Sequence, residues 1–212
     1  MKESCKINPA LFKVIDGGKV YDRDAVLNHI VKVGKTYHNP DFNLKGKDIE
    51  TVLRLCIYFF EIIPEYKKYN IEMGKGVLLI GPTGCGKTTI IQIFSRILGG
   101  NSLTIPIHPS TSISNDYSKD GPKAIEKYSG ITKKTYCIDD LGIEKPSMYF
   151  GNKKCVISEI IQCRPKNKAI TYATSDLSLE EIKDRYEPRI ISRMREMFNV
   201  INYDISSLDK RK

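Results

Sequence analysis

The sequence predicts an α/β domain with three layers, in which helices cover both faces of a five-stranded parallel sheet. From residue 71 onward, short apolar runs alternate with helix-type patterns. A glycine-rich turn joins the first of these runs to a helix, and a later run ends in two adjacent aspartates. Strands that alternate with helices form parallel sheets, because each crossover lays its helix on a face of the sheet. The chain has 212 residues, which is enough for one such domain and a small extension.

The first 70 residues lack this alternation and predict a small helical extension. Asp22 is placed to cap one helix, and Asp48–Ile63 predicts a second, which Pro64 ends. The second helix has a wide apolar face and should be largely buried. We therefore divide the chain into an extension, 1–70, that could bind a partner, and a core domain, 71–212.

The first strand of the core, 76–80, leads into the most informative turn of the chain. Its residues are Gly81, Pro82, Thr83, Gly84, Cys85, Gly86, Lys87 and Thr88, followed by Thr89 at the start of a helix. They fit the pattern G-x-x-x-x-G-K-[ST] of the nucleotide-binding P-loop. In that loop, backbone N–H groups at a helix start surround phosphate, the lysine reaches the β- and γ-phosphates, and the hydroxyl ligates Mg²⁺. The alternative is an ordinary glycine turn, for which composition gives a chance match of about 1%.

Between this helix and the next chemical motif, the signals are weaker. Ser102–Ile107 predicts a second strand, with Pro106 marking an edge or an end. His108–Asp120 is polar and predicts a loop, which either faces a nucleic acid or is an exposed connection. Pro122–Tyr128 predicts a short helix.

Thr135–Asp140 is an apolar strand that ends in paired carboxylates, the Walker B pattern. At the carboxyl end of such a strand, Asp139 would lie beside Thr88 and hold Mg²⁺. Asp140 would orient or deprotonate the attacking water. Two aspartates after a strand are a weak signal alone, and they gain weight by following the P-loop.

The rest of the chain continues the alternation. Three helices are predicted, over Cys155–Cys163, Glu180–Tyr186 and Pro188–Glu196, and two strands, over Ala169–Thr174 and Asn199–Ile205. The first of these strands ends in Ser175 and Asp176, a polar tip that could sense a γ-phosphate. Arg189 and Arg193 are four residues apart and share one face of the last helix.

Composition limits the partners and the compartment. The formal net charge is +9, from 34 Lys+Arg against 25 Asp+Glu. It favours a polyanionic partner, although general solubility is an equal explanation. The six cysteines form no C-x-x-C pair, so we expect a reduced, cytoplasmic protein. The sequence shows neither an apolar run of membrane-spanning length nor a signal-peptide pattern, so we expect no membrane association.

Taken together, these motifs resemble the AAA+ ATPases of the DnaC/IstB-like branch. The resemblance covers roughly 75–205 and rests on the P-loop, 138–142, 150–153, 173–178 and 189–194. It implies strand order 5-1-4-3-2, ATP bound between neighbouring subunits of a homo-oligomer, and an absent or vestigial helical lid. By motif position, Arg193 matches the arginine finger, with Arg189 as its companion. Asp176 matches the first sensor, usually an asparagine, and Ser175 is the alternative.

The resemblance therefore implies an ATPase that depends on ATP and Mg²⁺. We expect a helicase loader in DNA replication, from a phage or mobile element, whose partners are a replicative helicase and single-stranded DNA. Two alternatives stay open: an IstB-like transposition helper, whose partner is a transposase, and a nucleotide-switched adaptor with negligible turnover. A P-loop kinase fits less well, because Asp139–Asp140 and the region around Arg193 argue against it.

Overall fold

A computed structural model of the chain describes residues 12–15, 18–99 and 104–203. Its contacts divide the chain into two compact units. Unit 1 comprises 1–72, 84–105 and 203–212, and unit 2 comprises 73–83 and 106–202. The expected boundary at residue 70 stays a prediction.

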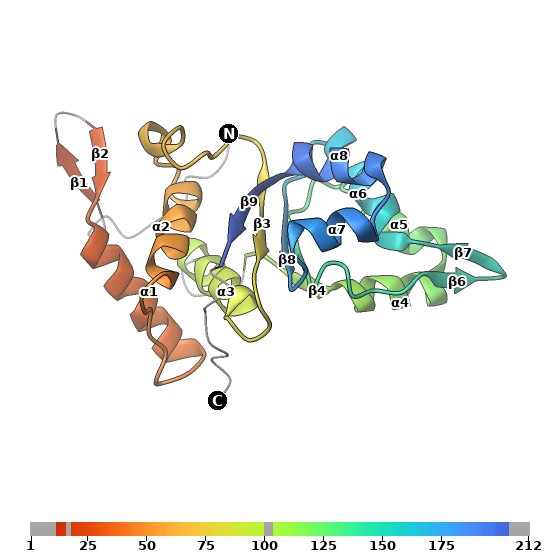
Figure 1. Ribbon diagram of the computed structural model, residues 1–212, viewed down its shortest axis with the longest axis horizontal. Coiled ribbons are helices and arrows are strands. Elements are labelled where there is room, and N and C mark those ends of the chain that lie inside the picture. The colour runs from red at the N-terminus through yellow and green to blue at the C-terminus, as the bar shows by residue number, and fades with distance from the viewer. Residues whose placement is uncertain (1–11, 16–17, 100–103, 204–212) are drawn as a thin grey trace. The chain divides into compact units, whose positions relative to one another are not determined.

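Unit 2 contains a five-stranded parallel sheet (Figure 1). Its strands are β3 (Gly76–Ile80), β4 (Ile107–Pro109), β5 (Tyr136–Asp139), β8 (Thr171–Ser175) and β9 (Phe198–Asn202). They lie in the order β4-β5-β8-β3-β9. Counted along the chain and read from the β9 edge, this is 5-1-4-3-2, so the expected α/β fold and strand order are confirmed.

Glycine at the start of β3 allows the central strands to approach each other. A Cβ atom on Gly76 would lie 1.7 Å from the carbonyl oxygen of Thr171 on β8, well inside any tolerated contact. On the other side, the Asn199 amide donates to the Gly76 carbonyl oxygen at 3.1 Å. The register of β3 between β8 and β9 thus depends on a residue without a side chain.

Five helices of unit 2 pack on the sheet through one apolar cluster. They are α4 (Ser110–Asp120), α5 (Pro122–Tyr128), α6 (Val156–Lys166), α7 (Leu179–Arg185) and α8 (Pro188–Met197). Strand residues such as Leu78, Ile138 and Ala173 meet helix residues such as Ile160 and Ile190, and all five are at most 2% exposed. The helices therefore form because each buries an apolar stripe.

A buried arginine forms hydrogen bonds with the end of α5 and with the residues at the starts of β5 and β8. Arg164, in the last turn of α6, is 1% exposed. Its guanidinium donates to the carbonyl oxygens of Tyr128, Lys134 and Ile170 at 2.8–3.0 Å, and to the Thr171 hydroxyl. It also lies 4.1 Å from the centre of the Tyr136 ring. Burial lowers the pKa of Arg164 and raises that of Tyr136 to about 12. Its guanidinium has five N–H donors for these four acceptors, whereas a lysine ammonium has only three.

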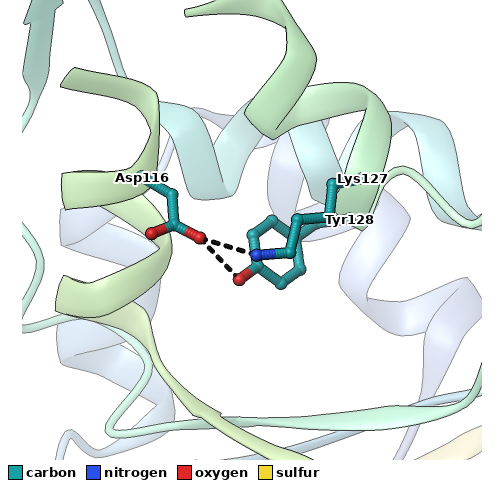
Figure 2. A network of polar contacts seen from close by, with 3 residues as sticks. All are labelled: Asp116, Lys127 and Tyr128. Atoms are coloured by element: carbon teal, nitrogen blue, oxygen red, sulfur yellow. Dashed lines mark hydrogen bonds and ion pairs between the residues drawn. The ribbon is translucent and has the colours of Figure 1, made fainter. Parts of the chain in front are cut away.

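A second polar network joins α4 to α5 (Figure 2). One Asp116 carboxylate oxygen accepts from the Lys127 ammonium at 3.0 Å and from the Tyr128 hydroxyl at 2.8 Å. The hydrogen bond from Lys127 holds the pKa of Asp116 below its usual value. His108 on β4 packs edge-on against Tyr128 and Tyr136, with ring centroids 5.3 and 5.5 Å away. At this edge of unit 2, packed aromatic rings therefore lie beside a network of hydrogen bonds and an ion pair.

Unit 1 groups the helix that follows the P-loop with the N-terminal helices. Its helices are α1 (Arg23–Tyr37), α2 (Asp48–Phe59) and α3 (Lys87–Leu98), and η2 (Ile63–Glu65) is one 3-10 turn. The rings of Phe59 and Phe94 stack at 4.8 Å, and the Arg96 guanidinium lies over the Tyr37 ring at 4.4 Å. The expected cap is present, since Asp22 accepts from the Ala25 N–H at 3.1 Å.

Two short hairpins were not expected from the sequence. β1 (Phe12–Ile15) pairs with β2 (Gly18–Tyr21), and β6 (Ser147–Tyr149) pairs with β7 (Asn152–Lys154), both antiparallel. Strands this short carry too few residues for an alternation signal.

The region after α3 contains the main errors of the sequence prediction. The strand expected at Ser102–Ile107 begins only at Ile107, because Pro106 has no N–H to donate to the sheet; residues 102 and 103 lie outside the described residues. The loop expected at His108–Asp120 is mostly the helix α4. Serine and asparagine disfavour helix locally, and burial of Ile113 and Tyr117, one turn apart, outweighs that preference.

Two helix ends also differ from the prediction. α2 ends at Phe59, before Pro64, and Glu61 adopts a left-handed φ of 54°. α6 continues through Arg164 and Pro165, because a proline in the last turn costs only one helical hydrogen bond. The strand expected at Asn199–Ile205 is β9, which ends at Asn202; Ile205 lies outside the described residues.

Candidate functional site

The first half of the P-loop leaves the sheet of unit 2. The Gly81 N–H donates to the Ser175 carbonyl oxygen at 3.2 Å, which continues the pairing of β3 with β8. Two residues later, the Thr83 hydroxyl donates to the Asp176 carboxylate at 2.6 Å. The start of the loop is therefore tied to the two predicted sensor residues.

The second half of the loop belongs to unit 1 and has the geometry of an anion site. Gly84 and Gly86 have φ values of 79° and 99°, which glycine adopts without strain. Gly86 is the N-cap of α3, and no side chain caps that helix start. Lys87 is 5% exposed, and its ammonium donates to the Cys85 sulfur at 3.8 Å. A helix start with a lysine and without a side-chain cap suits a phosphate group.

The paired aspartates lie at the carboxyl end of β5 as predicted, and a threonine on the neighbouring strand positions both. Thr174 on β8 is fully buried, and its hydroxyl donates to the Asp139 carboxylate at 2.6 Å. The same oxygen accepts the N–H of Asp140 at 3.0 Å. One side chain thus fixes the rotamer of Asp139 and the backbone of Asp140. Sequence reasoning assigned Thr174 no role, and the available signal was a threonine in an apolar strand beside the aspartates.

Asp140 has a left-handed backbone, with φ at 55°. This conformation costs of order 1–3 kcal/mol for residues other than glycine, and aspartate is among those that adopt it most readily. The Asp140 N–H donates to Thr174, as described above, and the Asp140 carbonyl oxygen accepts from the Ser110 hydroxyl at 2.7 Å. The neighbouring Leu141 N–H donates to the Thr174 carbonyl oxygen at 2.7 Å. These bonds hold the residue where the chain leaves β5, with its side chain half-exposed.

The two sensor candidates differ in how their side chains are used. Ser175 is fully buried; its hydroxyl donates to the Leu141 carbonyl oxygen at 2.7 Å and accepts the Leu177 N–H at 3.1 Å. Asp176 is half-buried and bonded to Thr83, on the P-loop. The serine therefore joins β8 to the segment after β5, and the aspartate faces the loop.

That segment is further anchored to the end of α7. Glu144 is 5% exposed; its carboxylate accepts the Gly142 N–H at 2.8 Å and the Tyr186 hydroxyl at 2.5 Å. Arg185 donates to the carbonyl oxygens of Gly142 and Glu144. Burial, together with the Glu144 charge, raises the pKa of Tyr186. Because one of its carboxylate oxygens accepts a bond within the segment and the other accepts the Tyr186 bond from the end of α7, Glu144 is structural.

Both predicted arginines lie on α8 and form surface ion pairs. The Arg193 guanidinium contacts the Glu196 carboxylate at 2.6 Å, with 41% of its side chain exposed. Arg189 contacts Glu187 at 2.8 Å and is 68% exposed. Exposed pairs of this kind contribute at most about 1 kcal/mol, so either arginine can exchange its partner for another anion.

Unit 2 therefore brings Thr83, Asp139, Asp140, Ser175 and Asp176 together at the carboxyl ends of β3, β5 and β8. Parallel sheets bind ligands at that edge. Unit 1 holds Lys87 and Thr88 at the first turn of α3, with Thr89 after them.

Comparison with known proteins agrees with this geometry. A family model described as "AAA domain (dynein-related subfamily)" matches residues 76–115. A Corynebacterium glutamicum (strain R) protein named "AAA ATPase forming ring-shaped complexes" is 41% identical over 69 residues, which are 32% of this chain and 12% of that protein. A "Proteasome-associated ATPase" from Nakamurella multipartita is 36% identical over 70 residues, again 12% of its length. The chain thus matches about an eighth of these curated relatives.

Among solved structures, that of the DnaC helicase loader has a TM-score of 0.57 at 18% identity and covers 77% of this chain and 94% of its own. That of DnaI has a TM-score of 0.55 at 22% identity and covers 77% and 88%. The domain therefore has the fold of these two solved structures, and its P-loop region matches the AAA-domain model.

Proposed function

We propose that this chain is an ATPase that uses ATP and Mg²⁺ to act as a helicase loader in DNA replication. One observation carries the proposal: a P-loop and a pair of aspartates follow the first and third strands of a sheet ordered 5-1-4-3-2. In folds of this class those positions serve phosphate binding and hydrolysis. The similarity to DnaC and DnaI over most of their length supports the choice of loader.

Residues 81–89 would hold the ATP phosphates, with Lys87 supplying charge at the β- and γ-phosphates. Thr88 and Asp139 would hold Mg²⁺, which neutralises charge on the phosphates when bound. These residues suit Mg²⁺ and phosphate. The Asp139 carboxylate is oriented by Thr174, and the start of α3 has no side-chain cap. Asp140 would accept the proton of the attacking water.

Asp176 or Ser175 would sense the γ-phosphate. We favour Asp176, since the Ser175 hydroxyl already has two partners. A carboxylate in that role needs a proton or a neighbouring cation, because it would otherwise repel phosphate.

Arg193, with Arg189 beside it, would complete the site of a neighbouring subunit in a homo-oligomer. The ring-shaped complexes named for a relative of the P-loop region support such an assembly. The partners we propose are a replicative helicase and single-stranded DNA. None of the helices in the part of the chain that the structure describes is both long and apolar enough to cross a membrane.

Steady-state ATP turnover, measured with and without single-stranded DNA, tests the activity. We expect Mg²⁺-dependent phosphate release. Tight ATP binding without turnover would indicate a nucleotide-switched adaptor. Capture with the chain as bait tests the role: recovery of a replicative helicase supports a loader, whereas recovery of a transposase would replace it with a transposition helper.

A further inference from the structure

The β6–β7 hairpin carries the most exposed large apolar side chain in the described part of the chain. Phe150 is 88% exposed at its tip, and Met148 on β6 is 58% exposed. Figure 1 shows the hairpin as a narrow ribbon whose tip extends beyond α4 and α5 of the same unit. An aromatic ring in such a position costs solubility without stabilising the fold, so it calls for an explanation.

The tip is held in a defined shape. Phe150 and Gly151 have φ values of 45° and 79°, which together make the two-residue turn of a tight hairpin. A left-handed phenylalanine is unfavourable, whereas asparagine or glycine would form this turn readily. The Phe150 backbone therefore lowers local stability while it exposes the ring. Strained backbone of this kind is common at functional sites.

The ring of Phe150 is also supported from below. It packs edge-on against Tyr149, with ring centroids 4.7 Å apart. Tyr149 in turn packs against Tyr117 on α4 at 6.0 Å and lies over Gly121, where an added Cβ would come within 2.4 Å of the ring. The exposed face of Phe150 is thus positioned by a chain of aromatic contacts that reaches the core.

The charged side chains of the hairpin are basic. Lys153 lies opposite Met148 in the hairpin register and is exposed. Lys154 follows, 3.8 Å from Glu159 on α6. Residues 145–155 contain three lysines and no acidic residue. The formal charge of the whole chain, +9, has the same sign.

We propose that the β6–β7 hairpin binds single-stranded nucleic acid, with Phe150 stacking on a base and Lys153 contacting the backbone phosphate. An aromatic platform beside basic groups is how proteins bind single strands without reading their sequence. Lysine is depleted in the cores of protein–protein interfaces, and in this hairpin lysines lie beside the exposed side chains. The surface therefore suits a strand better than a protein. The inference rests on the proposed function for its single-stranded partner and locates the surface that would bind it. It is separate from ATP hydrolysis, since none of the proposed ATP-site residues lies in the hairpin.

Fluorescence anisotropy with labelled oligothymidylate and oligouridylate tests the proposal on the full chain. We expect the wild type to bind with an affinity that falls as salt rises, and Phe150→Ala to weaken binding about 5- to 150-fold, the contribution of stacking on one base. Phe150→Trp should retain binding, and Phe150→Leu should not, because leucine is apolar but has no π face. A preference for one oligonucleotide tells DNA from RNA.

Separate variants test the effect of a lysine charge and the effect of removing an exposed apolar side chain. Lys153→Gln should reduce the steepness of log affinity against log salt by about 0.7, the value for one phosphate contact on a single strand. Lys183→Gln on α7 removes a charge elsewhere on unit 2 and should leave the slope unchanged. Ile131→Ala removes another side chain, 61% exposed, and should leave affinity unchanged.

Three results would overturn the proposal: a wild type that binds neither oligonucleotide, Phe150→Ala or Phe150→Leu binding like wild type, or Phe150→Ala altering the oligomeric state instead. ATP turnover of each protein is measured in parallel, so the two proposals fail separately. Phe150→Ala that binds like the wild type with normal turnover would contradict this inference alone, whereas a wild type without ATP turnover would contradict the proposed ATPase alone.

Discussion

Lys87 is the residue on which nucleotide binding should depend most. Its side chain is 5% exposed at the first turn of α3, where backbone N–H groups and a positive charge favour phosphate. We expect Lys87→Ala to abolish tight ATP binding, as measured with a fluorescent ATP analogue. Circular dichroism establishes that the variant is folded. A folded variant with unchanged ATP affinity would remove the P-loop assignment.

Asp140 should matter for chemistry and not for binding. In Asp140→Asn, the proposed metal ligand Asp139 remains, while the water loses its base. We expect ATP affinity to be kept and turnover to fall at least a hundredfold, because a general base contributes about 10²-fold or more. Each tenfold loss corresponds to about 1.4 kcal/mol of barrier. Rapid-quench measurement of a single turnover reports the step directly. Wild-type turnover would move the base to another residue, and Glu144 is a poor candidate because both of its oxygens are engaged.

Thr174 should act through the aspartates as a positioning residue. Thr174→Val keeps the shape of the side chain but removes its hydrogen bonds to the Asp139 carboxylate and the Asp140 N–H. Hydrogen bonds to charged groups contribute about 1.5–3 kcal/mol, so turnover should fall roughly tenfold or more with ATP affinity retained. Thr174→Ser restores the hydroxyl and should restore most of the rate. A purely structural role would lower the stability of both variants and leave the turnover of the folded protein unchanged.

At the scale of elements, the edge around β4 should make stability depend on pH. Burial first, and the Lys127 charge second, lower the pKa of His108, although Asp116 opposes them. A lowered pKa means that the unfolded state binds more protons, so stability should be complete above the ordinary histidine pKa of about 6.5 and fall as pH drops below it.

His108→Phe keeps a ring between Tyr128 and Tyr136 and should flatten this dependence. Urea unfolding at several values between about pH 5 and pH 8 measures it. Part of the slope should remain, because burial also lowers the pKa of His29 and His38. An unchanged slope would show that His108 titrates normally.

At the scale of the whole molecule, the proposed site is shared between subunits, and mixing inactive variants tests this. Arg193→Ala and Lys87→Ala should each be inactive. In a mixed assembly, some interfaces pair an intact Lys87 with an intact Arg193, and part of the ATPase activity should return. The expected loss for Arg193→Ala alone is large, about 10³–10⁵ in rate for arginine fingers.

Two outcomes would contradict the shared site. Co-assembled variants that remain inactive would exclude a finger acting across the interface. Full activity of Arg193→Ala alone would leave the ion pair with Glu196, a contact worth at most about 1 kcal/mol, as the better account.

The sequence by itself determined the elements whose signals are local. The P-loop between β3 and α3, the aspartates after β5, the cap of α1 and the proline at the start of α8 follow from residues close together in the chain, so spacing and propensity predict them. The strand order 5-1-4-3-2 was implied by family resemblance and is confirmed by the pairing.

Only the tertiary structure decided the rest, because those features depend on residues far apart in the chain. α4 forms against its own propensity, since Ile113 and Tyr117 are buried in the core. Thr174 reaches aspartates about 35 residues away, and Phe150 is supported through Tyr149 by Tyr117. Periodicity reports which face of an element is apolar. It does not report which hydroxyl, ring or carbonyl group from a distant part of the chain will contact that element. Those contacts orient the side chains of the candidate site.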